Sequence, residues 1–273
     1  MRVNSEIRQS RRRRGVYLLP NLLTTAALFS GFYAIIAAIN GRFEPAAVAV
    51  FVAMILDGLD GRIARLTHTE SEFGSQYDSL SDLVCFGLAP ALLMYQWALG
   101  GMAALGPAPA KLGWLAAFIY TAGAALRLAR FNVQMGSADK RYFIGLPSPS
   151  AAAIMVGLVW VGNDLGISGG QLLWLAFVIT IGAGLLMVSR ILYHSFKHVD
   201  LKGRVPFVAA ITIVLVLVLA SLDPPKVLFA GFLTYGLSGP VLFLWRRRQR
   251  SRRRRSETAE PKDKNPDATI ESE

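Results

Sequence analysis

The chain has 273 residues, 53% of them hydrophobic, and a formal net charge of +11. A soluble globular domain does not normally combine so apolar a composition with so basic a charge, which argues against a soluble enzyme or binding module. The positive charge is concentrated in arginine runs near the two ends, at Arg11–Arg14 and within 246–255, which flank the apolar part. Arginines in that position are typical of cytoplasmic membrane anchors, so a membrane protein is favoured over a nucleic-acid-binding protein.

Eight apolar stretches follow one another along the chain. The first is too long for the core of a cleavable signal peptide and no small-residue cleavage site follows it, so we expect it to stay on the protein. A helix needs about 20 apolar residues to cross a bilayer, and no stretch alternates like a barrel strand. The predicted fold class is therefore all-α, a polytopic transmembrane helical bundle of about eight spans. The predicted spans are Val16–Ile39, Pro45–Leu66, Leu80–Leu99, Leu112–Val133, Pro149–Val161, Gln171–Leu192, Val205–Leu222 and Lys226–Trp245.

The loops on the two sides of these spans differ in charge. Most loop lysines and arginines, together with both arginine-rich ends, fall on one side. By the positive-inside rule that side faces the cytoplasm, so both termini are predicted to be cytoplasmic. The basic loop residues on this side are Arg62, Arg65, Lys140, Arg141, Lys197 and Lys202, and those on the other side are Arg42, Lys111 and Lys226.

Three regions are expected along the chain. Residues 1–15 form a basic cytoplasmic segment, and residues 16–245 form the transmembrane domain. Residues 246–273 form a cytoplasmic tail that is first basic and then polar. We expect this tail to be disordered because Ser256–Glu273 shows no apolar periodicity.

Four aspartates lie at helical spacing where the second and third spans meet. Residues three or four apart share one face of a helix, so the aspartates form two stripes. If the second helix descends to the cytoplasm and the third returns, the two stripes face each other near the inner edge of the bilayer. One stripe consists of Asp57, Asp60, Gly61 and Arg65, and the other of Gly74, Asp78 and Asp82.

Carboxylates gathered at membrane depth repel one another and are costly to desolvate, so a cation must neutralise them. Arg65 alone is insufficient. Magnesium prefers oxygen ligands and commonly binds a few carboxylates together with substrate phosphates, and manganese behaves similarly. The aspartates therefore predict a divalent metal site, Mg²⁺ or Mn²⁺, rather than a set of independently solvated charges.

The other residues of the two stripes allow two interpretations. Glycines in transmembrane helices usually serve close helix packing, but Gly61 and Gly74 would also let a bulky ligand approach a helix backbone. Arg65 either extends to the interface or forks onto a phosphate group. Their place beside the aspartates favours the ligand-binding interpretation for all three.

The aspartate segment resembles the signature of the CDP-alcohol phosphatidyltransferase family, D-x2-D-G-x2-A-R-x8-G-x3-D-x3-D, and fills all eight fixed positions between Asp57 and Asp82. Three further segments look like the phosphatidylserine synthase branch of that family. They are PNLLTTAALFSGFYAI near the start, ALRLARFN at Ala125–Asn132 and YFIGLPSPSAA at Tyr142–Ala152.

This resemblance implies a reaction in which CDP-diacylglycerol gives its phosphatidyl group to L-serine and CMP leaves. It implies that three aspartates bind metal and that Asp82 both binds metal and acts as the catalytic base. It also implies contacts to the CDP portion, although a Pro-Asn at a helix start is equally a cap. The implied metal ligands are Asp57, Asp60, Asp78 and Asp82, and the implied nucleotide contacts are Asn21, Thr24, Gly61, Arg65, Ser71 and Gly74.

A serine acceptor brings a carboxylate that suits a cationic, forked partner. Arg127 and Arg130 lie at the predicted cytoplasmic end of the fourth span. Arg130 serves equally well as a cytoplasmic anchor, whereas Arg127 lies deeper, where a charged residue generally faces a cavity or a partner. The histidine pair His194 and His198 has metal-ligand spacing but no nearby ligands, so it is left out of the site.

Two alternatives remain open from the sequence. One is the same chemistry with another acceptor alcohol, such as glycerol 3-phosphate, which calls for more convergent basic residues. The other is a carboxylate-gated cation transporter, in which acidic residues follow the whole translocation depth. We further expect a homodimer in a bacterial inner membrane, with the site facing the cytoplasm and no nucleic-acid partner.

Overall fold

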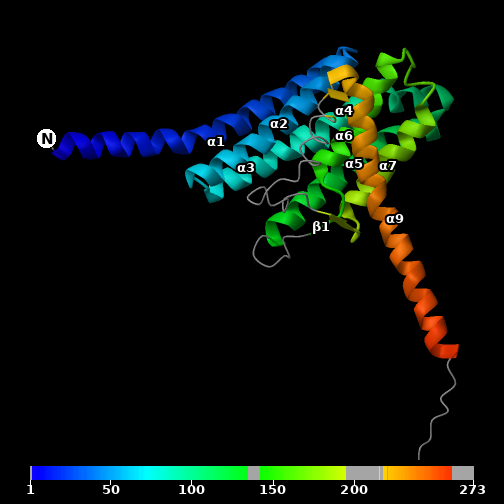
Figure 1. Ribbon diagram of the computed structural model, residues 1–273. Helices are drawn as coiled ribbons and strands as arrows, with labels where there is room; N and C mark the ends of the chain where they lie inside the picture. The colour runs from blue at the N-terminus through cyan, green and yellow to red at the C-terminus, as the bar shows by residue number, and fades with distance from the viewer. Residues whose placement is uncertain (1, 135–141, 195–214, 216–217, 220, 260–273) are drawn as a thin grey trace, which may run out of the picture.

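The computed structural model describes residues 2–134, 142–194, 215, 218–219 and 221–259. Within these residues the protein is a bundle of helices with one very small sheet, so the predicted helical class is confirmed (Figure 1). Most of the seventh predicted span and the loop residues Lys140, Arg141, Lys197, His198 and Lys202 lie outside the described part of the chain.

The first two helices form a tight antiparallel pair. Helix α1 covers Arg2–Ile39 and helix α2 covers Phe43–Thr67, with Gly41 turning between them at a φ of +71°. Small buried residues on both helices, among them Ala34 and Ala46, let the backbones approach closely. The side chain of Ser30 donates a hydrogen bond across the pair to the carbonyl oxygen of Ala49.

The third predicted span begins earlier than the sequence suggested. Helix α3 starts at Glu72 and ends at Asp82, and the chain continues through the π-helical segment η1, helix α4 and the 3₁₀ segment η2. The π-helical turns loosen the backbone ladder directly after Asp82, and Tyr120 donates a hydrogen bond of 2.8 Å to the carbonyl oxygen of Phe86. The bounds are Glu72–Asp82 for α3, Leu83–Leu88 for η1, Ala89–Trp97 for α4 and Leu99–Leu105 for η2.

Helices α5, α6 and α7 complete the core. Helix α5 (Pro107–Gln134) crosses helix α7 (Leu173–Val188) where Gly123 meets Gly184. Helix α6 (Ser148–Asp164) is buried along most of its length in the middle of the bundle. It corresponds to the short fifth predicted span and has only 17 residues.

Two three-residue strands and helix α9 close one side of the bundle. Strand β1 (Tyr142–Ile144) pairs with strand β2 (Leu192–His194) in antiparallel register. Helix α9 covers Pro224–Ala259 and contacts β2, where Tyr193 donates a hydrogen bond of 3.0 Å to the carbonyl oxygen of Gly236. Figure 1 shows α9 running along the bundle and then projecting away from it.

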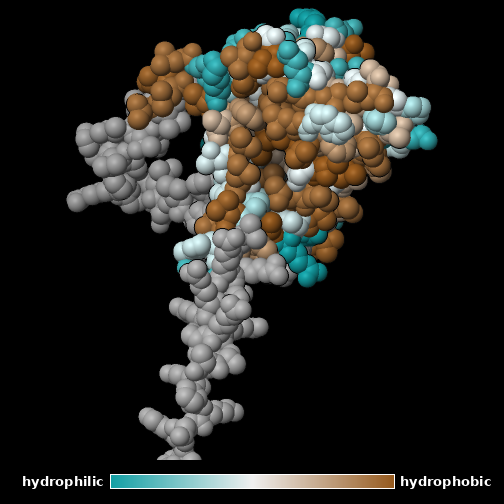
Figure 2. Space-filling view, turned by 90° about the vertical axis from the view of Figure 1, so that its right-hand side faces the viewer, coloured by the Kyte–Doolittle hydropathy of each residue, from teal (hydrophilic) through white to brown (hydrophobic). Residues whose placement is uncertain are grey.

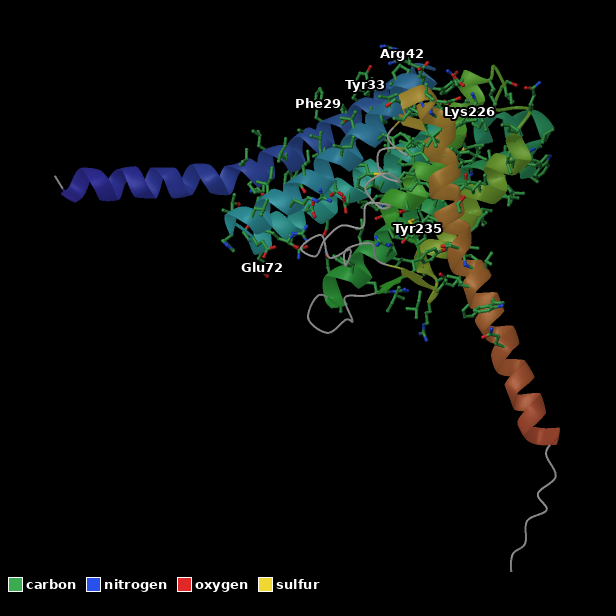
Figure 3. All side chains as sticks on the ribbon, viewed as in Figure 1. Phe29, Tyr33, Arg42, Glu72, Lys226 and Tyr235 are labelled. Carbon is green, nitrogen blue, oxygen red and sulfur yellow. The ribbon has the colours of Figure 1, made fainter. Side chains whose placement is uncertain are left out.

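Among the residues that the structure describes, four helical segments are long and apolar enough to cross a membrane. Helix α2 is not among them, because every 18-residue stretch of it contains at least three charged residues. The exposed flank in Figure 2 is largely hydrophobic, with hydrophilic residues gathered towards the two ends, as expected for a protein embedded in lipid. Arg42 and Lys226, which the sequence analysis places on the same side, lie towards one end of the bundle (Figure 3). The four segments are Leu19–Ile39, Glu72–Leu105, Pro107–Val133 and Pro224–Phe243.

Two features differ from the sequence-based expectations. The small sheet was not foreseen, and it takes Leu192 out of the predicted sixth span, whose helix ends at Val188. Strands of three residues are too short to show an alternating pattern. Helix α9 also continues through the arginine-rich segment to Ala259, so the first residues of the expected disordered tail are helical. Residues 260–273 lie outside the described part.

Candidate metal and nucleotide site

The candidate site lies where α2 ends and α3 begins. Helix α2 is terminated by His68, which adopts the left-handed conformation with a φ of 52°. Three residues later Ser71 caps α3 by accepting a hydrogen bond of 3.0 Å from the backbone N–H of Gly74. This short connection reverses the chain, so that aspartates of α2 and α3 face each other as the sequence predicts.

Three of the four aspartates come together. One carboxylate oxygen from each of Asp57, Asp60 and Asp78 lies within 4.8 Å of the others. At an effective dielectric constant of about 20, two charges at such a distance repel by roughly 3–4 kcal/mol. Clustered hard oxygen ligands on two rigid helices are the donor set that Mg²⁺ and Mn²⁺ prefer, so these residues fit a divalent cation.

The first helix also contributes to this cluster. Thr24 of α1 is buried and donates a hydrogen bond of 2.6 Å to Oδ2 of Asp60. A second contact, of 2.9 Å, joins the hydroxyl groups of Thr25 and Tyr77 and ties α1 to α3. The bond from Thr24 orients the Asp60 carboxylate, as supporting residues do around metal ligands. Thr24 is therefore bound to one of the clustered aspartates, and its expected contact to the nucleotide stays a prediction.

Asp82 lies one helical turn beyond Asp78, deeper in the bundle. It is not part of the three-oxygen cluster, but its carboxyl group contacts that of Asp57 and lies within electrostatic range of Arg127. Asp82 thus links the cluster to a buried cation. Asp82 was expected both to bind metal and to act as the base, and the structure places it outside the group of three clustered oxygens.

The expected nucleotide contacts lie on α1, α2 and the start of α3. A Cβ atom added to Gly74 would lie 3.0 Å from Oγ of Ser71 and 3.3 Å from Oδ1 of Asn21, so these three residues adjoin. Gly61 is exposed and its missing Cβ would meet nothing within 4 Å among the described residues. Arg65 is exposed on the last turn of α2. Open space beside Gly61, with a cation next to it, suits a diphosphate group.

Arg127 and Arg130 have different surroundings. The Nη1 atom of Arg127 donates a hydrogen bond of 2.8 Å to Oγ of Ser148, while its Nε atom is shielded from solvent and has no hydrogen-bond partner among the described residues. Arg130 donates a hydrogen bond of 3.0 Å to the carbonyl oxygen of Val188, the last residue of α7. Arg130 is therefore engaged in holding the end of a helix, whereas Arg127 keeps hydrogen-bonding capacity.

Sequence reasoning missed the neighbours of Arg127. Ser148 lies in the segment YFIGLPSPSAA, which was noted for its resemblance but not for a role in the site. Tyr235 of α9 lies within electrostatic range of Arg127. At the end of the same helix α5, Asn132 donates a hydrogen bond of 3.1 Å to Ser79 of α3. Only helix packing over long sequence separations creates these contacts, so the local pattern carried no signal for Tyr235.

Comparison with known proteins agrees with this geometry. The family model for CDP-alcohol phosphatidyltransferases matches residues 17–182. A protein of Helicobacter pylori named CDP-diacylglycerol--serine O-phosphatidyltransferase is 37% identical over 224 residues, covering 81% of this chain and 90% of that protein. Proteins of the same name from Mycobacterium leprae and Bacillus subtilis are 30% and 32% identical, over 83% and 66% of this chain and 75% and 91% of their own lengths. The chain belongs to the CDP-alcohol phosphatidyltransferase family.

Proposed function

We propose that this protein transfers the phosphatidyl group of CDP-diacylglycerol to L-serine, forming phosphatidylserine and CMP. The observation that carries the proposal is the convergence of Asp57, Asp60 and Asp78, from two helices, within 4.8 Å. The names of the relatives, which match most of the chain, support serine as the acceptor.

Asp57, Asp60 and Asp78 would hold a divalent metal ion, Mg²⁺ or Mn²⁺. When bound, such an ion polarises a diphosphate and neutralises the charge that develops on the leaving group. The residues of this chain supply the rest of the site. Asn21, Gly61, Arg65, Ser71 and Gly74 surround the space for the cytidine diphosphate portion, while Thr24 keeps Asp60 oriented.

Asp82 is the proposed general base. The serine hydroxyl loses its proton to the Asp82 carboxylate as its oxygen forms a bond to the phosphorus that carries diacylglycerol. The bond between that phosphorus and the oxygen of CMP breaks, and CMP leaves with the bonding electron pair. The position of Asp82 beside Asp57, but outside the three-oxygen cluster, supports this division of roles.

Arg127 is the proposed partner of the serine carboxylate. Its Nη1 atom is bonded to Ser148, and its Nε atom, which has no partner among the described residues, remains for a carboxylate, which guanidinium groups bind in a forked manner. Arg130 already donates to Val188, which leaves few convergent cations for a phosphate-bearing acceptor such as glycerol 3-phosphate. This arrangement favours serine over that alternative.

The protein is an integral membrane protein, and we propose that its site faces the cytoplasm of a bacterial inner membrane, with both termini on that side. We also propose eight spans and a homodimer. The positions of Arg42 and Lys226 support this orientation. The sequence assigns both to the side opposite the arginine-rich ends, and both lie towards the same end of the bundle (Figure 3).

The test is a purified-enzyme assay with CDP-diacylglycerol, Mg²⁺ or Mn²⁺, and labelled serine, inositol or glycerol 3-phosphate in parallel reactions. We expect labelled phosphatidylserine and an equal amount of CMP from serine, and little labelled lipid from the other two acceptors. Faster transfer to glycerol 3-phosphate, or CMP release without any labelled lipid, would overturn the serine assignment.

A further inference from the structure

Arg127 lies at the level of the proposed general base in the packing of α5 against α3 and η1. Near the end of α5, Asn132 donates a hydrogen bond of 3.1 Å to Ser79 of α3. Further along, α5 passes so close to η1 that a Cβ atom added to Gly87 would lie 3.3 Å from the Cβ atom of Ala124. Arg127 lies between these two contacts on α5, and the proposed base lies between them on the opposing segment. The arginine is therefore carried beside the place where the acceptor must lie.

The direction of the Arg127 guanidinium group is set by a buried hydroxyl group. Its Nη1 atom donates a hydrogen bond of 2.8 Å to Oγ of Ser148, which is fully buried at the first residue of α6. The Nε atom of Arg127, in contrast, is shielded from solvent and has no hydrogen-bond partner in the described part of the chain. Because a guanidinium group is flat and rigid, fixing Nη1 also restricts the direction of the Nε–H group. Ser148 is thus placed to aim the N–H group that remains for a ligand.

The turn that carries Ser148 is fixed to the end of α7. The backbone N–H of Leu146 donates a hydrogen bond of 3.0 Å to the carbonyl oxygen of Leu186. Gly145 adopts a φ of +81°, and a Cβ atom there would overlap the carbonyl oxygen of Met187. Glycine allows both this conformation and so close an approach. The turn therefore has a defined position relative to α7, and Ser148 begins the helix that follows it.

Arg130 completes this set of contacts from α5. It lies about one helical turn beyond Arg127 and donates a hydrogen bond of 3.0 Å to the carbonyl oxygen of Val188, the last residue of α7. One arginine of α5 thus holds the end of α7 and the other contacts the start of α6, while the turn joins α6 to α7. A binding group that is held in place before the ligand arrives loses less conformational entropy on binding. These contacts therefore prepare Arg127 for a ligand that fits one orientation of its guanidinium group.

We propose that Ser148 is a positioning residue for the acceptor: its hydroxyl group holds Arg127 so that the free Nε–H group meets the carboxylate of the amino-acid substrate. This inference rests on the proposed function, because it presupposes an acceptor with a carboxylate. It gives the start of α6 a part in selecting the acceptor, separate from the proposed metal and nucleotide contacts of α1, α2 and α3. Loosening Arg127 should therefore impair an acceptor that has a carboxylate more than one that lacks it.

The experiment uses the full-length enzyme and compares two acceptors. One is L-serine, and the other is 2-amino-1,3-propanediol, which carries a hydroxymethyl group in place of the carboxylate. The variant is Ser148→Ala, and Ser150→Ala is its matched control, because Ser150 lies in the first turn of the same helix and is half-buried. The ratio kcat/KM is measured for each acceptor, together with the KM for CDP-diacylglycerol and the midpoint of thermal unfolding.

Loss of a hydrogen bond to a charged group predicts a fall of about tenfold in kcat/KM for serine in Ser148→Ala. The value for the diol and the KM for CDP-diacylglycerol should stay within about twofold of the wild type, so the preference for serine falls by about tenfold. In Ser150→Ala the preference should not change. Ser148→Cys keeps the size of the side chain but accepts hydrogen bonds only weakly, and it should lower the preference in the same direction. This variant decides the question if Ser148→Ala lowers the unfolding midpoint.

The two acceptors separate positioning from a merely structural role. An equal loss with both acceptors would mean that Ser148 only supports the fold, which overturns the inference. An unchanged preference in both Ser148 variants also overturns it, as does equal use of the two acceptors by the wild type. If the wild-type enzyme makes no phosphatidylserine at all, the proposed function fails instead, so the two failures are distinguishable.

Discussion

Glycines serve opposite purposes in two regions of this protein. At the crossing of α5 and α7, a Cβ atom on Gly123 would lie 2.6 Å from the carbonyl oxygen of Gly184, so the helix backbones are in direct contact. On the face of α2 that carries the aspartates, Gly61 is exposed and nothing described lies within 4 Å of where its Cβ would be. In the first region the glycines allow close packing of two helices, and in the second the glycine leaves space beside the helix for a ligand.

The same contrast applies to the polar groups. The crossing of α5 and α7 needs no charged residue, because the close backbones supply van der Waals contact. The α2 and α3 face gathers three carboxylates and supports them with hydroxyl groups such as that of Thr24. Burying carboxylates that repel one another does not stabilise the fold, so such a cluster indicates a functional site. Substitutions in the two regions should therefore separate activity from stability.

The largest effect on activity is expected from Asp78→Asn. This change keeps the shape of the side chain but removes one anionic ligand of the proposed metal site. Metal assistance is worth several kcal/mol, so kcat should fall by roughly 10³-fold or more while the thermal unfolding midpoint does not fall. Initial rates at several Mg²⁺ and Mn²⁺ concentrations check this. Activity near that of the wild type at any metal concentration would argue against Asp78 as a ligand.

Asp82→Asn should lower kcat by about 10²- to 10³-fold, because an amide cannot accept the serine proton. Binding of CDP should persist, since Asp82 lies outside the three-oxygen cluster. Calorimetry with CDP and rate measurements on the same preparation test both halves of this expectation. If CDP binding is lost together with the rate, Asp82 acts chiefly in ligand binding, and the assignment of a base there is wrong.

Thr24→Val removes the hydroxyl group that donates to Asp60 while keeping the volume of the side chain. Residues that support metal ligands typically contribute about 10- to 100-fold in metal affinity or activity. We expect the metal concentration for half-maximal rate to rise by about tenfold, with a smaller change in the rate at saturating metal. Thr234→Val is the control, since Thr234 is exposed on α9 and bonds only within its own helix. An equal effect in both variants would contradict the supporting role of Thr24.

The smallest effects on catalysis, and the clearest on stability, come from alanine at the two kinds of glycine. Gly123→Ala should destabilise the protein by about 1–3 kcal/mol because the added methyl group overlaps a backbone oxygen. Gly182→Ala on α7, with no neighbour described within 4 Å, is its matched control. Gly61→Ala should leave the unfolding midpoint unchanged and raise the KM for CDP-diacylglycerol. Destabilisation by Gly61→Ala, or none by Gly123→Ala, would erase the distinction between the two regions.

The sequence predicts the aspartate face well because its information is local. Asp57 and Asp60 share a helix face by spacing alone, and a short turn of residues around Ser71 suffices to bring Asp78 opposite them. Asp57, Asp60 and Asp78 therefore converge as expected, whereas Asp82, expected as a fourth metal ligand, lies outside this three-oxygen cluster.

The surroundings of Arg127 were beyond sequence reasoning. Tyr235 packs against Tyr193 of a strand of only three residues, and neither α9 nor this strand has a sequence pattern that marks the contact. The π-helical turns after Asp82 likewise lie against another helix, whose Tyr120 donates a hydrogen bond to the carbonyl oxygen of Phe86. Such features depend on tertiary contacts, which override local preference.

The most direct test of the central claim is Mn²⁺ binding to the purified protein in the presence of CDP, followed by electron paramagnetic resonance. The account predicts that the wild type and Gly182→Ala bind Mn²⁺ equally, and that Asp57→Asn and Asp78→Asn lose this binding at the same metal concentrations. Mn²⁺ binding by both aspartate variants as tight as that of the wild type would contradict a metal site between α2 and α3.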